Sequence, residues 1–292
     1  MEKLLQLTLT GMTNGAILAL IALGFVLIYK ASDVLNFAQG DFMVVGAFIS
    51  FGLIVEVGLP WPAGVLGTVL IAILLGILIE RFILRPLIGE SIISVIMVTI
   101  GLSSLLRAIV SAIWGTTGRP FPPFLPDQPI DIFGATIPSD RLITIGLVTI
   151  LFILFSLFFR FSREGIAMRA TADDQQAALT MGISVKKVFA LAWSIAAVTA
   201  VLAGVIVANI IGVSLAVASL GLVVFPVVIL GGLDSIRGAI VGGVFIGLLQ
   251  AFVAGYTPSQ LALSTIVPYF VLIIVLMIKP YGLFGKVKIE RV

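Results

Sequence analysis

Few side chains in this sequence could carry out catalysis. The 292 residues include no cysteine and no histidine, which excludes thiolate and imidazole nucleophiles and the metal sites built from those ligands. Asp173 and Asp174 form the one adjacent acid pair, and no cluster of acids surrounds them. An enzyme acting on lipid phosphates needs clustered carboxylates or histidines. We therefore expect a protein that is not an enzyme and that binds no metal and no cofactor of its own.

Nucleotide hydrolysis is not expected in this chain either. A phosphate-binding loop reads Gly-x-x-x-x-Gly-Lys-Ser/Thr, because its backbone N–H groups and its lysine surround the phosphates. Gly285 and Lys286 form the one Gly-Lys pair, and Val287 follows them. Any ATP-driven process involving this protein would need an ATPase on another chain.

The composition indicates the solvent in which the chain folds. Apolar types make up 60% of the residues and charged types 11%, whereas a soluble domain carries about a quarter charged residues. One helical span of the hydrocarbon core needs about 20 apolar residues, so the chain could supply roughly eight or nine spans. Its Lys and Arg residues are scattered instead of forming a stripe, which argues against nucleic-acid binding. We expect an integral membrane protein.

Nine apolar segments follow one another along the chain, and none alternates polar and apolar residues with period 2, so helices are predicted and not barrel strands. The segments are 10–29, 42–57, 62–84, 93–114, 141–160, 188–211, 212–232, 238–254 and 262–279. Two are marginal, because 42–57 follows the polar stretch 31–41 and 212–232 is interrupted by Ser214, Ser219, Gly221 and Pro226. The prediction is an all-α polytopic transmembrane bundle, one domain over 1–292, with about eight or nine spans of which one or two are broken or re-entrant.

The basic residues predict the orientation. If the loop 160–187 is cytoplasmic, alternation of the nine segments places 13 Lys and Arg inside and 3 outside, with Arg107 embedded. Cytoplasmic loops carry the excess of basic residues in membrane proteins. We expect the N-terminus outside and the C-terminus inside, and we expect the first apolar segment to be a retained span.

The predicted outer loop, 115–140, contains six of the 13 prolines. Proline at this density excludes a long helix and favours extended backbone. Either the loop is a stiff connector or it is a docking lip for an external partner, and at this length it is too short to be a ligand-binding domain.

The predicted inner loop, 160–187, has a helix-forming stretch at 169–181, and Gly182 is placed as its C-cap. The apolar residues Met168, Ala172, Leu179 and Ile183 are expected to share one face, which suits a helix resting in a cleft of a cytoplasmic protein. The alternative is a solvated loop without a partner.

Five segments, in their order and spacing, resemble the LivH-type permease of branched-chain amino acid ABC transporters. They are 24–30 (GFVLIYK), 36–41 (NFAQGD), 163–173 (REGIAMRATAD), 231–238 (GGLDSIRG) and 279–285 (KPYGLFG). The resemblance runs from about residue 8 to the C-terminus. Gln39 stands where the family commonly has His, and Gln cannot become charged, so a titrating residue is not expected there.

The resemblance implies a permease subunit in the bacterial cytoplasmic (inner) membrane, surrounded by lipid and paired with a LivM-like second permease. It implies two cytoplasmic ABC ATPases, which bind ATP and Mg²⁺, and a periplasmic solute-binding protein facing 115–140. The loop 160–187 would then be the cytoplasmic coupling loop. The residues that it would present to the ATPases are Arg169, Asp173, Asp174, Gln176, Ala177, Ala178 and Gly182.

A solute path is expected where helices break near the middle of the membrane, because the freed backbone groups can bind a zwitterion. Two breaks qualify, 36–41 and 231–238, and we interpret them as corresponding elements of two internal halves. The path residues predicted are Asn36, Gln39, Gly40, Asp41, Gly231, Gly232 and Asn209, with Asn14, Ser104, Arg107 and Ser214 as further candidates.

Several candidates have a structural alternative. Asp41 is costly in apolar surroundings unless it is paired, so its alternatives are a helix N-cap or an ion pair with Lys30. Arg107 lies within reach of the outer interface, and a structural ion pair is expected ahead of substrate binding. Asn14 stands among small residues whose spacing favours close helix packing. That packing role is predicted for Gly11, Gly15, Gly238, Gly242, Gly243 and Gly247.

The function predicted is transport of branched-chain or other neutral amino acids through an ATP-dependent importer. A urea or short-amide permease of the same family is one alternative, since nothing in the sequence separates leucine from urea. A stand-alone secondary carrier or channel is the other, and it would transport without partner chains.

Overall fold

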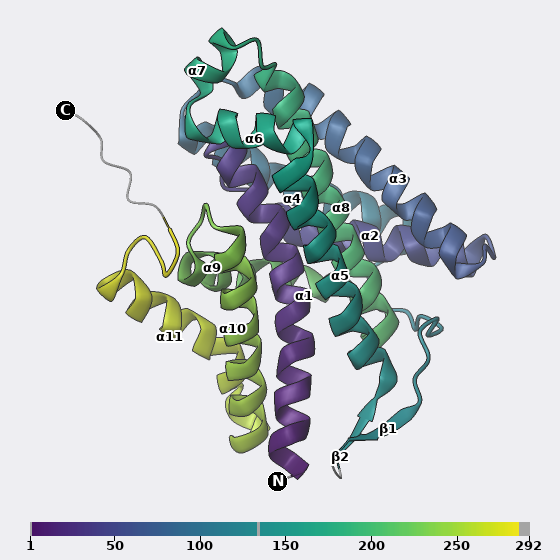
Figure 1. Ribbon diagram of the computed structural model, residues 1–292. Coiled ribbons are helices and arrows are strands. Elements are labelled where there is room, and N and C mark those ends of the chain that lie inside the picture. The colour runs from purple at the N-terminus through teal and green to yellow at the C-terminus, as the bar shows by residue number, and fades with distance from the viewer. Residues whose placement is uncertain (1, 133–134, 286–292) are drawn as a thin grey trace.

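The computed structural model describes residues 2–132 and 135–285, and these form a bundle of long helices (Figure 1). The elements are α1 (Glu2–Ser32), α2 (Gln39–Phe51), η1 (Gly52–Glu56), α3 (Trp61–Ile79), η2 (Glu80–Leu84), η3 (Arg85–Leu87), α4 (Ile92–Trp114), β1 (Pro129–Ile132), β2 (Ala135–Pro138), α5 (Ser139–Phe161), α6 (Arg163–Asp173), α7 (Gln175–Thr180), α8 (Val185–Ile211), η4 (Leu215–Ser219), α9 (Leu220–Gly231), α10 (Ile236–Tyr256), η5 (Ser259–Leu261) and α11 (Leu263–Ile278).

All nine predicted apolar segments are helical. Within the described residues, seven helices are long and apolar enough to cross a membrane, and two shorter apolar ones, Leu215–Gly231 and Leu263–Ile278, accompany them. The predicted all-α membrane bundle with broken helices is therefore confirmed.

The helix α1 is the central element of the bundle. Its most apolar window is 89% buried, against 17% for α5 and 22% for α4, so the other helices surround it. It packs mainly on α10 and α8. Small residues allow the close approach, because Gly15 and Gly247 face one another and Gly243 lies against Ala19. The predicted packing glycines thus lie in the α1–α10 contact, except for Gly238 and Gly242, which contact α9.

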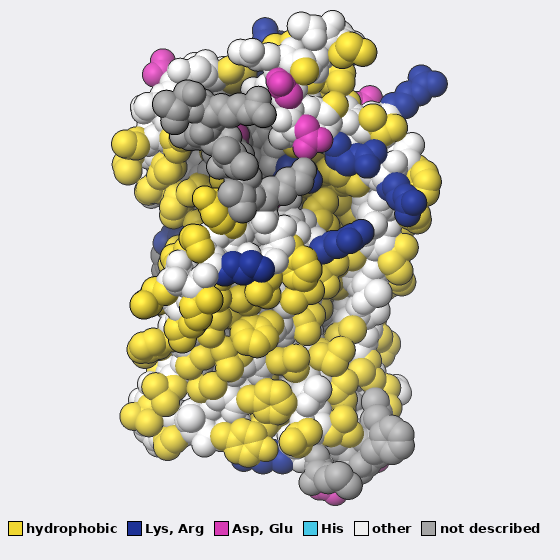
Figure 2. Space-filling model, turned by 60° about the vertical axis from the view of Figure 1, so that its left-hand side comes forward, with side chains coloured by type: hydrophobic (Ala, Val, Ile, Leu, Met, Phe, Trp, Pro, Cys, Tyr) yellow, Lys and Arg dark blue, Asp and Glu magenta, His cyan; other side chains and the backbone are white. Residues whose placement is uncertain are grey.

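The two ends of the bundle differ in charge. One end, called here the basic end, contains the end of α1, the η2–η3 segment, the helices α6 and α7, and the start of α8 (Figure 1). Figure 2 shows Lys and Arg side chains gathered toward this end above a broad apolar belt. The opposite end, called the hairpin end, contains the antiparallel pair β1–β2.

The prediction for 169–181 was wrong in one respect, because two helices cover this stretch and not one. Asp174 interrupts them with extended backbone (φ −156°, ψ 111°), and its carboxylate accepts hydrogen bonds from the N–H groups of Gln176 (2.8 Å) and Ala177 (2.9 Å). A capping carboxylate at the start of a helix satisfies N–H groups that have no partner within the helix. Gly182 follows α7 with φ +82°, as a C-cap glycine does.

The predicted shared apolar face also divides at this break. Met168 on α6 is buried against α1 and α8, whereas Leu179 on α7 is 57% exposed. In the proline-rich stretch, no helix forms between α4 and β1, as predicted, but the hairpin β1–β2 was not expected from the sequence.

The α1–α10 contact makes a stability prediction. A Cβ atom on Gly15 would lie 2.7 Å from Val244 Cα and 2.8 Å from Gly243 O, which are backbone atoms of α10. Overpacking of this kind costs about 1–3 kcal/mol. We expect Gly15→Ala to lower the thermal unfolding midpoint of the detergent-solubilised protein. Gly146→Ala is the control, because a Cβ there meets no atom within 4 Å. Equal midpoints for the two variants would contradict the packing.

Candidate functional site

Two short helices begin inside the bundle, and their first turns meet. Gln39, the first residue of α2, donates from Nε2 to Ile21 O (3.4 Å) and to Ala196 O (3.2 Å), so α2 begins beside the middle of α1 and of α8. The start of α9 lies against it, since a Cβ on Gly40 would be 2.9 Å from Gly221 Cα. The N-termini of α2 and α9 therefore converge deep within the membrane-spanning region.

The loop that joins α1 to α2 satisfies its own backbone. Asn36 accepts a hydrogen bond from Ala38 N (3.0 Å) and donates to Gln39 Oε1 (3.1 Å). The hydroxyl of Thr99 on α4 accepts from Phe37 N (3.3 Å). Broken backbone is tolerated at this depth only when protein groups or water replace the lost helical bonds. Asn36 and Gln39 are buried, so these two predicted path residues stabilise the break and present almost no surface to a solute.

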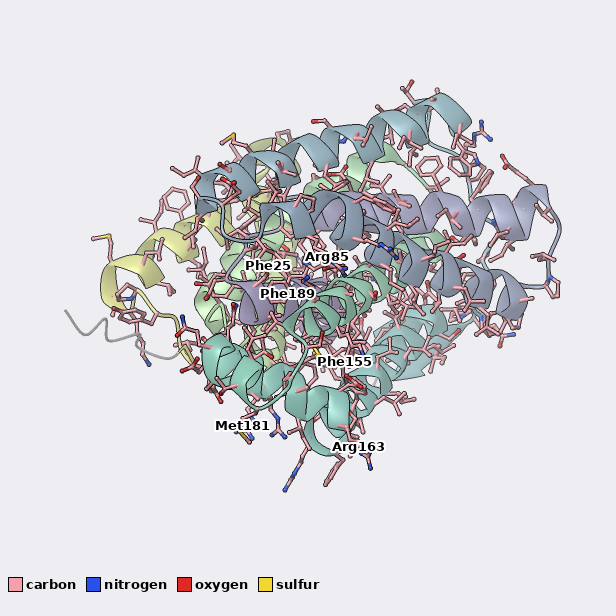
Figure 3. All side chains as sticks on the ribbon, turned by 90° about the horizontal axis from the view of Figure 1, so that it is seen from above. Phe25, Arg85, Phe155, Arg163, Met181 and Phe189 are labelled. Atoms are coloured by element: carbon pink, nitrogen blue, oxygen red, sulfur yellow. The ribbon has the colours of Figure 1, made fainter. Side chains whose placement is uncertain are left out.

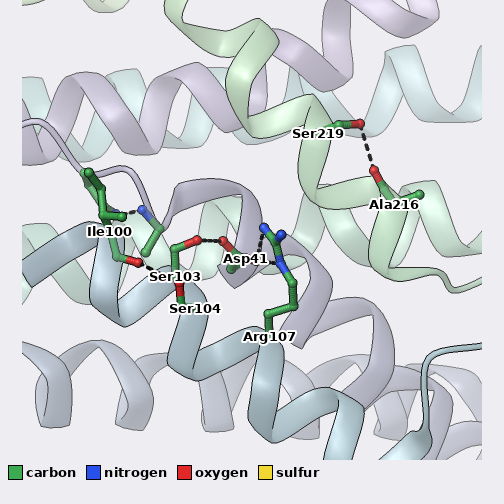
Figure 4. A network of polar contacts seen from close by, with 9 residues as sticks. Asp41, Ile100, Ser103, Ser104, Arg107, Ala216 and Ser219 are labelled. Carbon is green, nitrogen blue, oxygen red and sulfur yellow. Dashed lines mark hydrogen bonds and ion pairs between the residues drawn. The ribbon is translucent and has the colours of Figure 1, made fainter. Parts of the chain in front are cut away.

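Asp41, in the first turn of α2, forms an ion pair with Arg107 of α4 (Figure 4). Nε and Nη2 of Arg107 both donate to Asp41 Oδ1 at 3.1 Å, and the hydroxyl of Ser103 donates to Oδ2. The expected structural ion pair of Arg107 is thus present. Both alternatives for Asp41 were wrong, because its partner is Arg107 and not Lys30, and the N-cap position of α2 belongs to Ala38.

The two partners differ in exposure, and this difference matters for what the site can do. The Asp41 side chain is 4% exposed, whereas that of Arg107 is 50% exposed on the outward face of α4. Ser104 is also exposed on that face, and its hydroxyl donates to Ile100 O (3.3 Å). A buried anion thus holds a cation at the surface of the bundle.

The second predicted break lies elsewhere. Residues 231–238 join α9 to α10 at the basic end, and Gly231 and Gly238 touch. The segment 279–285 covers this turn, since Leu283 N donates to Leu230 O (2.8 Å) and Phe284 N to Gly231 O (3.0 Å). The break that faces 36–41 is instead 214–221. Its sequence signal was the interruption of an apolar segment by Ser214, Ser219 and Gly221.

Other predicted path residues have structural contacts. Asn209 on α8 is buried, and its Oδ1 accepts from Phe124 N (2.9 Å) and Leu125 N (3.1 Å), so it anchors the proline-rich loop. Ser214 caps η4 by accepting from Ala216 N (3.2 Å). Asn14 is exposed to a mainly apolar cavity of about 520 Å³ between α1, α8 and α10 at the hairpin end.

The residues predicted for coupling lie on α6, on α7 and just after α7. Most are exposed, but Asp174 caps α7 and Ala178 is buried. Leu179, which was predicted as part of the apolar docking face, is 57% exposed, and Met181, which was not predicted, is 82% exposed. Figure 3 shows Met181 projecting away from the bundle. Large apolar side chains with this exposure at a charged end of a protein are typical of a docking surface.

A comparison with known families agrees with this architecture. Residues 7–276 match the family described as "Branched-chain amino acid transport system / permease component". The chain belongs to this family. Its relatives include the high-affinity branched-chain amino acid transport system permease protein LivH of Salmonella typhimurium, which is 32% identical over 99% of this chain and 97% of the relative. The corresponding protein BraD of Pseudomonas aeruginosa is 30% identical over 99% and 98%.

A more distant relative and a solved structure extend the comparison. A probable branched-chain amino acid permease LivH of Methanocaldococcus jannaschii is 27% identical over 92% of this chain and 89% of the relative. In the structure of PsaBC from Streptococcus pneumoniae in complex with Fab, one chain superposes with a TM-score of 0.53 at 16% identity, over 93% of this chain and 91% of that one. This likeness shows that the two chains share a fold. The seven helices of the described residues that are long and apolar enough to cross a membrane, together with the permease family match, make this chain a multi-pass membrane protein.

The Asp41–Arg107 pair predicts unequal effects of its two single substitutions. Arg107→Gln leaves a buried carboxylate without its cation, whereas Asp41→Asn leaves a half-exposed guanidinium that water can reach. Breaking a fully buried pair costs about 3–5 kcal/mol, and we expect about 1–3 kcal/mol for Arg107→Gln because Arg107 is half exposed.

Thermal unfolding of the four proteins of the double-mutant cycle tests this. We expect Arg107→Gln to be the less stable single variant, and we expect Asp41→Asn with Arg107→Gln to be more stable than the two losses added together. Strict additivity would show that the pair contributes no coupling.

Proposed function

We propose that this chain is the permease subunit of an ATP-dependent importer that translocates branched-chain or other neutral amino acids. It would pair with a LivM-like second permease, bind two cytoplasmic ABC ATPases through α6 and α7, and receive its solute from a periplasmic binding protein at the hairpin end. ATP and Mg²⁺ would bind to the ATPases, and this chain would bind no cofactor. The basic end would face the cytoplasm of the bacterial inner membrane, with the N-terminus outside.

The exposed apolar surface of α7 is the observation that supports this proposal most directly. A stand-alone carrier has no need for such a surface at its charged end. Gln175 of α7 donates to Ala31 O (3.5 Å) in the last turn of α1, and Met168 of α6 belongs to the same buried apolar cluster as Leu23 and Leu27 of α1. A force on α7 would therefore reach the central helix.

The contacts that would transmit this force continue from α1 to the break between α1 and α2. Gln39 bonds to Ile21 O, and Gly24 lies against the Gln39 side chain and Thr199 of α8. Interfaces packed this closely have few alternative arrangements, so displacement of one helix is passed to its neighbour. ATP-driven movement of α7 would in this way shift the half-helices that meet at Gly40 and Gly221.

The relatives and the charges of the bundle interior support the proposed substrate class. The relatives' names specify branched-chain amino acids. The described residues of the bundle interior contain ion pairs but no concentrated unpaired charge, which suits a small zwitterion better than a polyvalent ion. A urea permease and a stand-alone carrier are the two alternative functions that the uptake experiment distinguishes from this one.

The deciding experiment is uptake of labelled leucine and urea in vesicles that contain this chain with and without the ATPases, the second permease and the binding protein. We expect leucine uptake that requires ATP and all partners. Uptake by this chain alone, indifferent to ATP, would favour a carrier or channel, and urea uptake without leucine uptake would favour the amide permease.

A substitution on α7 tests the coupling surface. Leu179→Asp places a charge on an exposed apolar position of α7, so the fold should survive while ATPase binding weakens. We expect ATP-dependent uptake to fall about tenfold or more, which corresponds to about 1.4 kcal/mol. Leu4→Asp at the hairpin end is the control, since Leu4 and Leu179 are equally exposed, at 57%. Normal uptake and normal ATPase co-purification with Leu179→Asp would exclude α7 as the docking element.

A further inference from the structure

Arg107 is a cation on the outward face of a membrane-spanning helix. It lies seven residues before Trp114, the end of α4, which places its Cα about 10 Å below that end at 1.5 Å per residue. Long basic side chains at this depth usually extend to the interface. Arg107 does not, because its Nε and Nη2 are both held by Asp41. A guanidinium held at this depth and half exposed cannot face lipid tails at low cost, so this face of α4 lines water or protein.

The guanidinium has donors left over. Its two described hydrogen bonds both go to Asp41 Oδ1, and within the described residues Nη1 makes none. The second oxygen of Asp41 is occupied by the hydroxyl of Ser103. Asp41 therefore fixes the orientation of Arg107 from behind, while the outer edge of the guanidinium stays available. Such an edge matches a carboxylate, which it can bind through two parallel N–H···O bonds.

The local field also favours an anion. The N-termini of α2 and α9 meet beside Asp41, and each carries the equivalent of about +0.5 charge. With Arg107 counted as +1 and Asp41 as −1, the balance before any ligand binds is about +1. One more negative group at Arg107 would bring this junction close to neutrality.

The rest of the open face is apolar. Counting by helical turns, Ile100 and Met97 lie one and two turns from Ser104 on the same side of α4, and their side chains are 41% and 59% exposed. A ligand with its carboxylate on Arg107 could lay an aliphatic side chain along these residues. Urea and short amides have neither group.

We propose that Arg107, oriented by Asp41, binds the α-carboxylate of the amino acid as it crosses the membrane along the open face of α4. This inference rests on the proposed function and adds the group that distinguishes an amino acid from a neutral amide. Arg107 contacts the solute, and Asp41 is a positioning residue. Ser104 offers a hydroxyl beside the bound carboxylate.

The main test uses the complete transporter in vesicles, with labelled leucine uptake and ATP hydrolysis stimulated by leucine-loaded binding protein measured together. We expect Arg107→Gln to reduce uptake about tenfold or more, equivalent to about 1.4 kcal/mol, while stimulated ATP hydrolysis stays within about twofold of wild type. Arg107→Lys should retain part of the uptake. Arg85→Gln is the matched control, because Arg85 also pairs with a buried acid, Glu80, but at the basic end and outside α6 and α7.

The double variant Asp41→Asn with Arg107→Gln separates binding from structure. If Arg107 binds the solute, removing both charges restores stability but not uptake. Restored uptake in the double variant, or normal uptake with Arg107→Gln alone, would overturn the inference. If wild-type uptake needs ATP and the partners, either of these results would overturn the inference and leave the proposed function intact. If wild-type uptake is independent of ATP, the proposed function itself is overturned.

A second readout follows from the absence of cysteine in this chain. In the assembled transporter, Ser104→Cys gives this chain a single maleimide-reactive position beside Arg107, and the labelling is read on this chain after the subunits are separated. We expect leucine, but not urea, to slow its labelling, and we expect this protection to disappear when Arg107→Gln is added. Slow labelling that is indifferent to leucine would show that a group of the second permease covers Arg107, and the inference would fail.

Discussion

The rest of this structure depends on one constraint, namely that backbone polar groups in the membrane interior must find partners within the protein. Regular helices meet it automatically, and the interruption at 33–38 does not. Asn36, Gln39 and Thr99 supply the missing partners from three directions, so the break is held by α1, α4 and α8 together. Because that support is distributed, a change in the relative position of any of these helices alters the break.

The glycines also help to meet this constraint. Two half-helices can shield one another's ends from lipid only if their backbones approach closely, and Gly40 against Gly221 permits this approach where any side chain would separate them. The α1–α10 contact uses Gly15, Gly243 and Gly247 in a similar way. In lipid, where apolar burial gives little association energy between helices, such close van der Waals contact carries much of the stability.

The sequence predicted the helices well and the contacts between them poorly. Hydropathy located all nine apolar helices, because the length of an apolar run is a local property. It also located the first break, since Asn36 and Asp41 are polar within apolar surroundings. It could not pair Asp41 with Arg107, which is 66 positions away, and it offered Lys30 because Lys30 is near in sequence. Ser214, Ser219 and Gly221 marked the break at 214–221, but the Gly-rich segment 231–238 gave the stronger local signal. The segment 279–285 packs over 231–238, and this tertiary contact could not be read from the local sequence.

The asymmetry of the Asp41–Arg107 pair argues that it has more than a stabilising role. Replacing a buried ion pair by well-packed apolar residues is often neutral or favourable, so stability alone gives little reason for a charged pair here. A pair that served only to join α2 to α4 would bury both partners, whereas this one buries the anion and leaves half of the cation at the surface. The Asp41–Arg107 pair lies beside the contact of Gly40 with Gly221. Helix α1 links this contact to α7, because Gln39 bonds to Ile21 O of α1 and Gln175 of α7 bonds to Ala31 O of α1. The cation is thus placed where movement of α6 and α7 would change its surroundings, which is what the proposed binding and release of a solute at Arg107 would require.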